Sequence, residues 1–375
     1  MTQKRLLFSC EFYVRDESGA DWIYETCILQ AATLNGWEGH VLAPNDMKQL
    51  PDRWHAVLRR PAVKATTPWA KVRLALQIEH DIVKGFNKVM SSRPDMEAAL
   101  LASSFTGMEF LGFVLAALRL RQRCQRVMAV FRFPIHEAKH QGWIYRMTHI
   151  LLRWFYPVQS VCYFTDTQAL AKSNGAYLHS SLRVLPIPHT TASSVPQLTN
   201  SVSICCWWAG LPRPEKGLAV MQALVRQPNN NRVQLCIIVA ESAHLKSSNP
   251  NIEIQTVPNS LSRTQYETLL NQANIILLPY YAENYRERSS GIFVEAVTAG
   301  KAVLVPKNTW MAQELVRYGL EQFAIEWSDS TQLPDIIHEA VHLHRSQNCF
   351  LKMQTDYQAF HSVRRFADVL QQYWS

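Results

Sequence analysis

Short apolar runs alternate with amphipathic stretches along most of the chain, and each run has the length of a buried strand. The runs are RLLFSCEF (5–12), HVLAP (40–44), VMAVFRF (127–133), VCYFT (161–165), SICCWW (203–208), LCIIVA (235–240), IILLPY (275–280) and AVLVP (302–306). The stretches between them repeat apolar residues at helical spacing. This alternation predicts parallel sheets covered by helices on both faces and joined by right-handed crossovers. We therefore expect an α/β protein built from doubly wound domains.

One segment interrupts the pattern, TTASSVPQLTNSVS at residues 190–203, where small and polar residues replace the periodic apolar positions. A chain of 375 residues is long enough for two or three domains with separate cores. We predict one domain over 1–190, a linker over 191–203, a second domain over 204–355 and a closing helix over 356–375. Doubly wound domains bind ligands beyond the carboxyl ends of their strands, so we expect a site there, between the two domains.

Composition and cysteine usage indicate where the protein works. The longest apolar stretch, FLGFVLAAL at 110–118, has about half the length of a membrane span. The first apolar run breaks at Glu11, too early for a signal peptide. The eight cysteines are scattered without a CxxC pair, which favours reduced thiols over a zinc site or a disulfide framework. These features predict a cytoplasmic protein that does not cross a membrane.

The net charge of +8 favours an anionic partner, which leaves nucleic acid, phosphate ligands and an acidic bilayer surface. The segment LRLRQRCQR (118–126) is predicted to end a helix with Arg119, Arg121, Arg123 and Arg126. A second basic stretch carries Arg53, Arg59, Arg60, Lys64, Lys71 and Arg73, interleaved with Trp54 and Trp69. Both stretches are either solvated faces or a surface for anionic lipid headgroups. Nucleic acid is the weaker alternative, because the sequence has no helix-turn-helix, RNA-recognition or zinc-finger pattern.

Two glutamates with seven residues between them, Glu287 and Glu295, flank a Ser-Ser-Gly turn in ERSSGIFVEAVTAG (287–300). The pattern predicts a strand ending near Pro279, a loop through Ser290, and a helix from about Gly291 to Thr298 that stops at Gly300. The turn amides would then lie at a helix N-terminus, where an anion is favoured. Carboxylates beside an anion site suit a nucleotide sugar, since they accept hydrogen bonds from sugar hydroxyls. The alternative is a solvated loop glutamate and an exposed helix glutamate.

A second segment, WWAGLPRPEKG (207–217), joins a predicted strand to a predicted helix. Gly210 permits a tight turn, and Arg213 and Lys216 place two cations at the junction. Cations beside a helix N-terminus would neutralise a diphosphate leaving group. The alternative is a surface loop with ordinary charges.

The order and spacing of GLPRPEKG, the two glutamates and the downstream AGKAVLVP resemble those of the retaining glycosyltransferases of GT-B fold, family 4. The segments SGADWIYETCILQAATLNGWEGHVLAP and LRVLPIP are similar to N-terminal parts of the same family. The resemblance implies two Rossmann-like domains facing across a cleft, with the closing helix returning to the N-terminal domain. It also implies sugar transfer from a nucleotide-diphosphate sugar with retention, without a metal or a further cofactor, to a glycan, a lipid-linked saccharide or another hydroxyl acceptor.

The same resemblance implies roles for individual residues. Arg213 and Lys216 would bind the departing diphosphate, Glu287 the donor sugar and Glu295 the ribose hydroxyls. The remaining donor-binding positions are Gly19, Gly210, Ser289, Ser290, Gly291 and Ile292. A catalytic histidine of the N-terminal domain corresponds to His136, or Arg132 takes its place.

Two other functions fit the same architecture. A nucleotide-sugar epimerase would need acid and base carboxylates for proton removal, and the sequence identifies none. A non-catalytic protein that binds sugar nucleotides or polyanions would need no catalytic group. The sequence does not identify the nucleotide base, the sugar or the acceptor.

Overall fold

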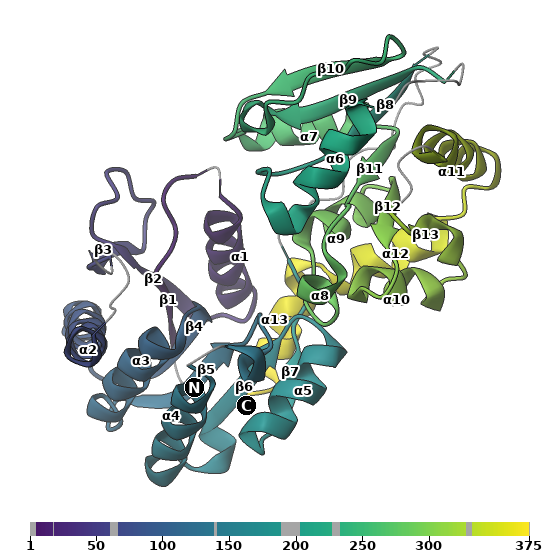
Figure 1. The fold of residues 1–375 in the computed structure, drawn as a ribbon. Coiled ribbons are helices and arrows are strands. Elements are labelled where there is room, and N and C mark those ends of the chain that lie inside the picture. Colours follow the sequence, from purple (N-terminus) through teal and green to yellow (C-terminus); the bar gives the residue numbers. More distant parts are fainter. Residues whose placement is uncertain are drawn as a thin grey trace. The chain divides into compact units, whose positions relative to one another are not determined.

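The computed structural model describes residues 5–17, 19–60, 67–138, 141–188, 203–226, 233–327 and 332–374. The chain divides into two compact units (Figure 1). Unit 1 comprises Met1–His189 and Val363–Ser375, and unit 2 comprises Thr190–Ser362. The predicted linker, apart from Ser203, lies outside the described residues. Each unit contains a parallel sheet with helices on both faces, so the predicted fold class is confirmed.

The sheet of unit 1 has seven parallel strands in the order β3-β2-β1-β4-β5-β6-β7. The strands are β1 (Arg5–Glu11), β2 (Glu38–Pro44), β3 (Trp54–Leu58), β4 (Glu97–Ser104), β5 (Cys124–Val130), β6 (Val161–Thr165) and β7 (Leu182–Val184). The direction of winding reverses between β1 and β4, which makes this pair the switch point of the sheet.

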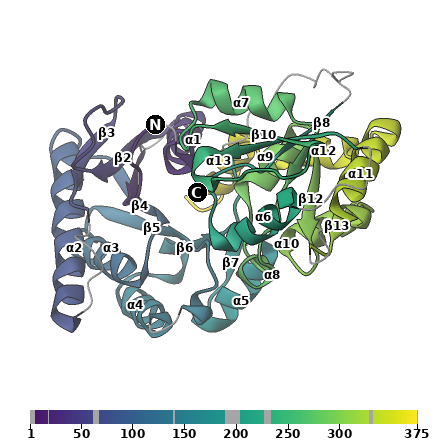
Figure 2. The same cartoon turned by 45° about the horizontal axis from the view of Figure 1, so that its top comes forward.

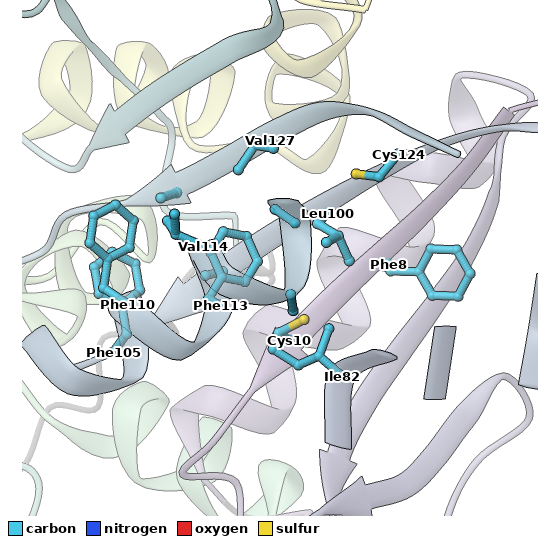
Figure 3. Packing of buried hydrophobic residues seen from close by; sticks show 14 of the residues in the cluster. Phe8, Cys10, Ile82, Leu100, Phe105, Phe110, Phe113, Val114, Cys124 and Val127 are labelled. Carbon is cyan, nitrogen blue, oxygen red and sulfur yellow. The ribbon is translucent and has the colours of Figure 1, made fainter. Parts of the chain in front are cut away.

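Right-handed crossovers place the helices of unit 1 on two faces of the sheet (Figure 2). One face carries α2 (Pro68–Met90), α3 (Gly107–Arg119), α4 (Gly142–Phe155) and α5 (Gln168–Leu178). Side chains from this face, Phe110 and Phe113 of α3 among them, pack with Phe8 and Leu100 of the sheet (Figure 3).

The opposite face of unit 1 is covered by α1 (Ala20–Leu34) and by α13 (Val363–Gln371), which comes from the other end of the chain. The second core contains Phe366 and Leu370 of α13 together with Ile28 of α1. Trp374 packs on Trp37 with ring centroids 4.5 Å apart. The last residues of the sequence therefore complete the core of the first unit.

Unit 2 has six parallel strands in the order β10-β9-β8-β11-β12-β13. The strands are β8 (Ile204–Trp207), β9 (Leu235–Ala240), β10 (Ile252–Val257), β11 (Ile275–Leu277), β12 (Ala302–Pro306) and β13 (Ala324–Ile325). The helices are α6 (Leu218–Arg226), α7 (Arg263–Gln272), α8 (Ala282–Tyr285), α9 (Gly291–Thr298), α10 (Trp310–Arg317), α11 (Leu333–Gln347) and α12 (Leu351–Phe360). Right-handed crossovers put α6 on one face and α7 and α9 on the other. The switch point lies between β8 and β11.

All eight apolar runs contain strands, whereas the helix predicted to end at 126 is wrong. Helix α3 ends at Arg119, because the capping residue Leu120 leaves helical geometry with a ψ of 4°; the amides of Arg123 and Cys124 then close a turn on the Leu120 carbonyl, both at 2.8 Å. Arg126 therefore lies in β5. The closing helix is also interrupted, at residues 361–362, between α12 and α13. No helix in the described part of the chain is both long and apolar enough to span a bilayer.

Candidate functional site

The two motifs of the C-terminal half follow adjacent strands. β8 and β11 pair in parallel, with Cys206 opposite Ile275, so their carboxyl ends lie at the same edge, at the switch point of unit 2. The amide of Tyr281 donates a hydrogen bond of 2.9 Å to the carbonyl of Glu215. The loop after β8 and the loop after β11 therefore contact each other directly.

Gly217 makes this close contact possible. Its φ is +85°, and a Cβ atom there would lie 2.0 Å from the Pro279 carbonyl oxygen. Only glycine fits, because a side chain would overlap the backbone and because L-residues rarely adopt this φ. The Trp208 indole N–H donates to the Lys216 carbonyl at 3.1 Å and fixes the same turn from the buried side.

Lys216 is buried, with 8 % of its surface exposed. Its Nζ lies 5.7 Å from the Tyr280 ring centroid. A Cβ on Gly210, whose φ is +87°, would lie 3.0 Å from this Nζ and 3.1 Å from Cδ1 of Ile292, the second residue of α9. Burial, together with the nearby Arg213 and Arg288, lowers the pKa of Lys216 to about 8, while Glu215 opposes the shift. The structure thus brings Gly210, Lys216 and Ile292 together.

Two arginines add positive charge around Lys216. Arg213 is 58 % exposed at its side chain, and its Nη1 lies 3.5 Å from Oε1 of Glu215. The Arg288 guanidinium lies 5.1 Å from the Tyr285 ring centroid, and its charge also depresses the pKa of Lys216. Sequence reasoning missed Arg288, although it directly follows Glu287.

Helix α9 runs from Gly291 to Thr298, as predicted. Ser290 is its buried N-cap residue, and the Ser290 Oγ accepts a hydrogen bond of 3.2 Å from the Phe293 amide. Ser289 and Gly291 are half-buried beside it. The segment before the cap is not a simple loop as predicted, because it contains the short helix α8.

The two glutamates have different surroundings. Glu287 is half-buried in the segment between α8 and α9. Glu295 is buried, so the alternative that made it an exposed helix residue is wrong. Its Oε1 lies 2.9 Å from Nη1 of Arg263 on α7. Burial and the charge of Glu295 raise the pKa of Tyr266 well above its ordinary value. Arg263 therefore holds the Glu295 carboxylate in place, with Tyr266 of the same helix close enough to feel its charge, and sequence reasoning identified neither.

The remaining predicted residues belong to unit 1. Gly19 is the N-cap residue of α1. His136 lies in a 3₁₀ turn (Ile135–Glu137) with 36 % of its side chain exposed, and its Nε2 is 3.8 Å from Oε1 of Glu137. The Arg132 guanidinium stacks 3.9 Å from the Tyr24 ring centroid. That Gly19, His136 or Arg132 lies near Lys216 of unit 2 stays a prediction.

A buried carboxyl pair lies at the switch point of unit 1. Glu11 ends β1, and its two carboxylate oxygens accept hydrogen bonds from the Tyr13 amide at 2.7 Å and the Ser103 hydroxyl at 2.8 Å. Glu25 of α1 is fully buried. Burial raises the pKa of Glu25 to about 7, and burial with the nearby Glu25 raises that of Glu11 well above its ordinary value. The sequence contained one sign of this buried pair, because Glu11 is a charged residue inside an otherwise apolar run.

The basic stretches of unit 1 are partly neutralised. Arg59 pairs with Asp81 at 2.8 Å, and Arg119 pairs with Glu79 at 2.8 Å. Trp54 is buried, whereas Trp69 is 84 % exposed. Lys64 lies outside the described residues. Within the described ranges, no group of three His, Cys, Asp or Glu side chains is placed to hold a metal ion.

The chain matches no family model and no curated protein. It is similar in structure to a glycosyltransferase from Rickettsia africae ESF-5, with 9% identity, coverage of 100% of this chain and 98% of that chain, and a TM-score of 0.63. It is also similar to an α,α-trehalose 6-phosphate synthase from Burkholderia multivorans, with 10% identity, coverage of 100% and 98%, and a TM-score of 0.64. A UDP-GlcNAc 2-epimerase from Neisseria meningitidis matches with 14% identity, coverage of 99% of each chain and a TM-score of 0.56. At such identities the likeness concerns the fold, which is GT-B.

Proposed function

We propose that the protein is a glycosyltransferase that moves a sugar from a nucleotide-diphosphate donor to a hydroxyl acceptor. The observation that carries this proposal is the buried Lys216 ammonium between Gly210 and the first turn of α9. A buried cation with a depressed pKa is costly, and such groups concentrate at functional sites. An anionic ligand at the helix N-terminus would remove that cost.

In this proposal Arg213, Lys216 and Arg288 neutralise the diphosphate, together with the amides at the start of α9. Glu287 accepts hydrogen bonds from the donor sugar. Glu295 accepts them from the ribose, with Arg263 fixing its orientation at 2.9 Å. Preorganised charges of this kind stabilise developing charge without reorganisation at the moment of reaction.

We propose transfer with retention and without a metal. The bond from the anomeric carbon to the diphosphate breaks, and the acceptor oxygen forms its bond on the same face of the sugar. The acceptor proton passes to the departing phosphate oxygen, so the protein need not supply a general base at that step. Positioning and electrostatic stabilisation then provide the rate enhancement.

The test has two stages. Thermal unfolding is first measured against a panel of UDP-, GDP-, ADP- and dTDP-sugars, since a ligand at 100 times its dissociation constant stabilises by about 2.7 kcal/mol. Transfer or slow hydrolysis of the stabilising donor is then compared between the wild type, Lys216→Ala and the exposed control Lys246→Ala. Equal turnover in Lys216→Ala and Lys246→Ala refutes the assignment of Lys216 to the donor site. Binding of a donor without any turnover identifies a non-catalytic binding protein instead.

A nucleotide-sugar epimerase is the second candidate, and the buried pair Glu11 and Glu25 favours it. Carboxyls with raised pKa values can take up and return a proton near neutral pH. Incubation with the donor in deuterated water distinguishes the two, since epimerisation by proton removal places deuterium on a sugar carbon and transfer does not. Loss of that exchange in Glu25→Gln, with donor binding retained, would establish the epimerase.

We also propose, for a lipid-linked acceptor, that the protein works at the cytoplasmic face of an anionic membrane. Exposed aromatic residues on two helices of unit 1 support this, namely Trp69 on α2 and Trp154 on α4, which are 84 % and 77 % exposed. Amphipathic rings beside arginines suit a bilayer interface. Flotation with anionic and neutral liposomes tests it, and equal recovery with both, or with neither, rejects an electrostatic membrane contact.

A further inference from the structure

Unit 1 contains a hollow of about 380 Å³ at the amino ends of β5, β6 and β7. Arg126 of β5, Arg153 of α4 and Arg183 of β7 line it, together with Ser180, Ser181 and Tyr373. Glu11, with its hydrogen-bond donor Ser103, lies at the carboxyl ends of β1 and β4, which is the opposite end of the same parallel sheet. The hollow therefore belongs to neither of the sites considered above.

The charges around this hollow are uncompensated. Its lining contains no aspartate or glutamate. Across the residues that the structure describes, Arg126, Arg153 and Arg183 form no ion pair, whereas Arg59 and Arg119 of the same unit each hold a carboxylate. Like charges that converge on one concave surface repel one another, and a bound anion offsets this repulsion because it attracts each of the cations.

Two of the guanidiniums are held in place by neutral groups. Nη1 of Arg126 donates a hydrogen bond of 2.6 Å to the Gln159 carbonyl. The Arg183 guanidinium lies 4.6 Å from the Tyr373 ring centroid, and that ring packs at 5.4 Å against Phe164. Burial raises the pKa of Cys162 to about 11, and both arginines oppose the shift, which places their charges near one thiol in the lining. The cations are thus oriented before any ligand arrives.

We propose that this hollow binds a phosphate ester or diphosphate. Guanidinium groups present paired N–H donors that match phosphate oxygens bidentately. The Ser180 and Ser181 hydroxyls supply further donors, and Tyr373 supplies an aromatic wall for the group that carries the phosphate. The volume lies near the lower end of the range for small-molecule sites, about 300–1,000 Å³, so it suits a small phosphorylated compound or one lipid headgroup.

The test measures anion binding rather than turnover, so it is independent of the proposed transferase activity. Inorganic pyrophosphate is titrated calorimetrically into the full chain carrying Lys216→Ala, which removes the buried cation of the unit 2 site; Arg213 and Arg288 remain in every variant that is compared. In that background Arg183→Gln and Arg126→Gln are compared with Arg146→Gln. Arg146 is the matched control because it is exposed on α4, outside the hollow, where its Nη2 lies 3.1 Å from Nε2 of His179.

We expect Arg183→Gln to weaken pyrophosphate binding by about 10-fold or more, since a hydrogen bond to a charged group contributes about 1.5–3 kcal/mol. Arg146→Gln should change it less than about twofold, in keeping with a surface charge. Equal effects of Arg183→Gln and Arg146→Gln refute the site. Arg183 is itself exposed, so its variant keeps the test valid if Arg126→Gln fails to fold.

Two further arms identify the source of the phosphate. Vesicles of phosphatidylcholine with and without phosphatidic acid are compared with soluble pyrophosphate. Binding of pyrophosphate that depends on Arg183 assigns the hollow to a soluble phosphorylated compound. Binding only to phosphatidic acid vesicles, lost in Arg183→Gln, assigns it to a lipid headgroup. Absence of both refutes the proposal.

Discussion

Replacing Lys216 by methionine should stabilise the protein and at the same time greatly reduce its turnover. Methionine has a similar length and carries no charge. The fall in the pKa of Lys216 from its ordinary 10.5 to about 8 corresponds to about 3 kcal/mol of folding free energy lost to the buried charge near neutral pH. Removing the ammonium should therefore raise the free energy of unfolding by up to about 3 kcal/mol. Turnover should fall about 100-fold or more, since one preorganised charge contributes about 2.7–4 kcal/mol to the barrier.

The size of this stabilisation depends on pH in a way that identifies the buried charge as its cause. Between pH 8 and 10.5 the folded protein has released the Lys216 proton, while the unfolded chain still holds it. Because the unfolded state then binds more protons, wild-type stability rises with pH across this window. The advantage of Lys216→Met should accordingly be full near pH 7 and disappear as the pH approaches 10.5.

Urea unfolding, followed by tryptophan fluorescence at several pH values, measures this difference. Lys246→Met is the matched control, since Lys246 is exposed in the same unit and its loss should alter stability by no more than about 0.5 kcal/mol. A Lys216→Met variant that is less stable than the wild type at pH 7, by an amount that stays constant with pH, would refute a desolvated ammonium at this position.

Three other substitutions test separate parts of the site. Glu287→Ala should lower turnover about 100-fold with the fold intact. Glu283→Ala is the control, because Glu283 is exposed and its loss should leave turnover unchanged. Similar rates in both variants would exclude Glu287 as a donor ligand. Arg263→Ala leaves the buried Glu295 without its ion pair and should lower the free energy of unfolding by about 3 kcal/mol. An unchanged midpoint in urea would contradict a structural pair. In Gly217→Ala the new Cβ would lie 2.0 Å from the Pro279 carbonyl oxygen, at a residue with a positive φ. The substitution should therefore lower the free energy of unfolding by at least about 2 kcal/mol, and a wild-type melting curve would show that the turn relaxes.

The sequence predicted the fold class because the signal was local. Each of the eight apolar runs contains a strand, and α9 begins after the predicted loop through Ser290 and ends before Gly300, as expected. Four strands were not predicted, β3, β4, β10 and β13. β10 and β3 mix polar with apolar residues, β13 has only two residues, and β4 is rich in alanine, which is a weak strand former.

The site was only partly predictable for a different reason. Lys216 and Gly210 were found because both stand in one short motif, and adjacency in sequence is visible. Arg263 reaches Glu295 from 32 positions earlier in the chain, and Ser103 reaches Glu11 across 92 positions. The order of the strands in the sheet decides which of these distant residues meet, and a single sequence contains no local signal for that order.

The position of α13 has a consequence for how the protein is made. A ribosome releases the chain from its N-terminus, yet the face of the first sheet beside α1 is covered by Phe366, Leu370 and Trp374. Until these residues emerge, the nascent protein carries an uncovered apolar surface while all of unit 2 is being synthesised. We expect fragments that stop at the end of α12 to aggregate or to recruit chaperones during translation. A circular permutant that begins at Val363, so that α13 is synthesised before β1, should relieve that dependence.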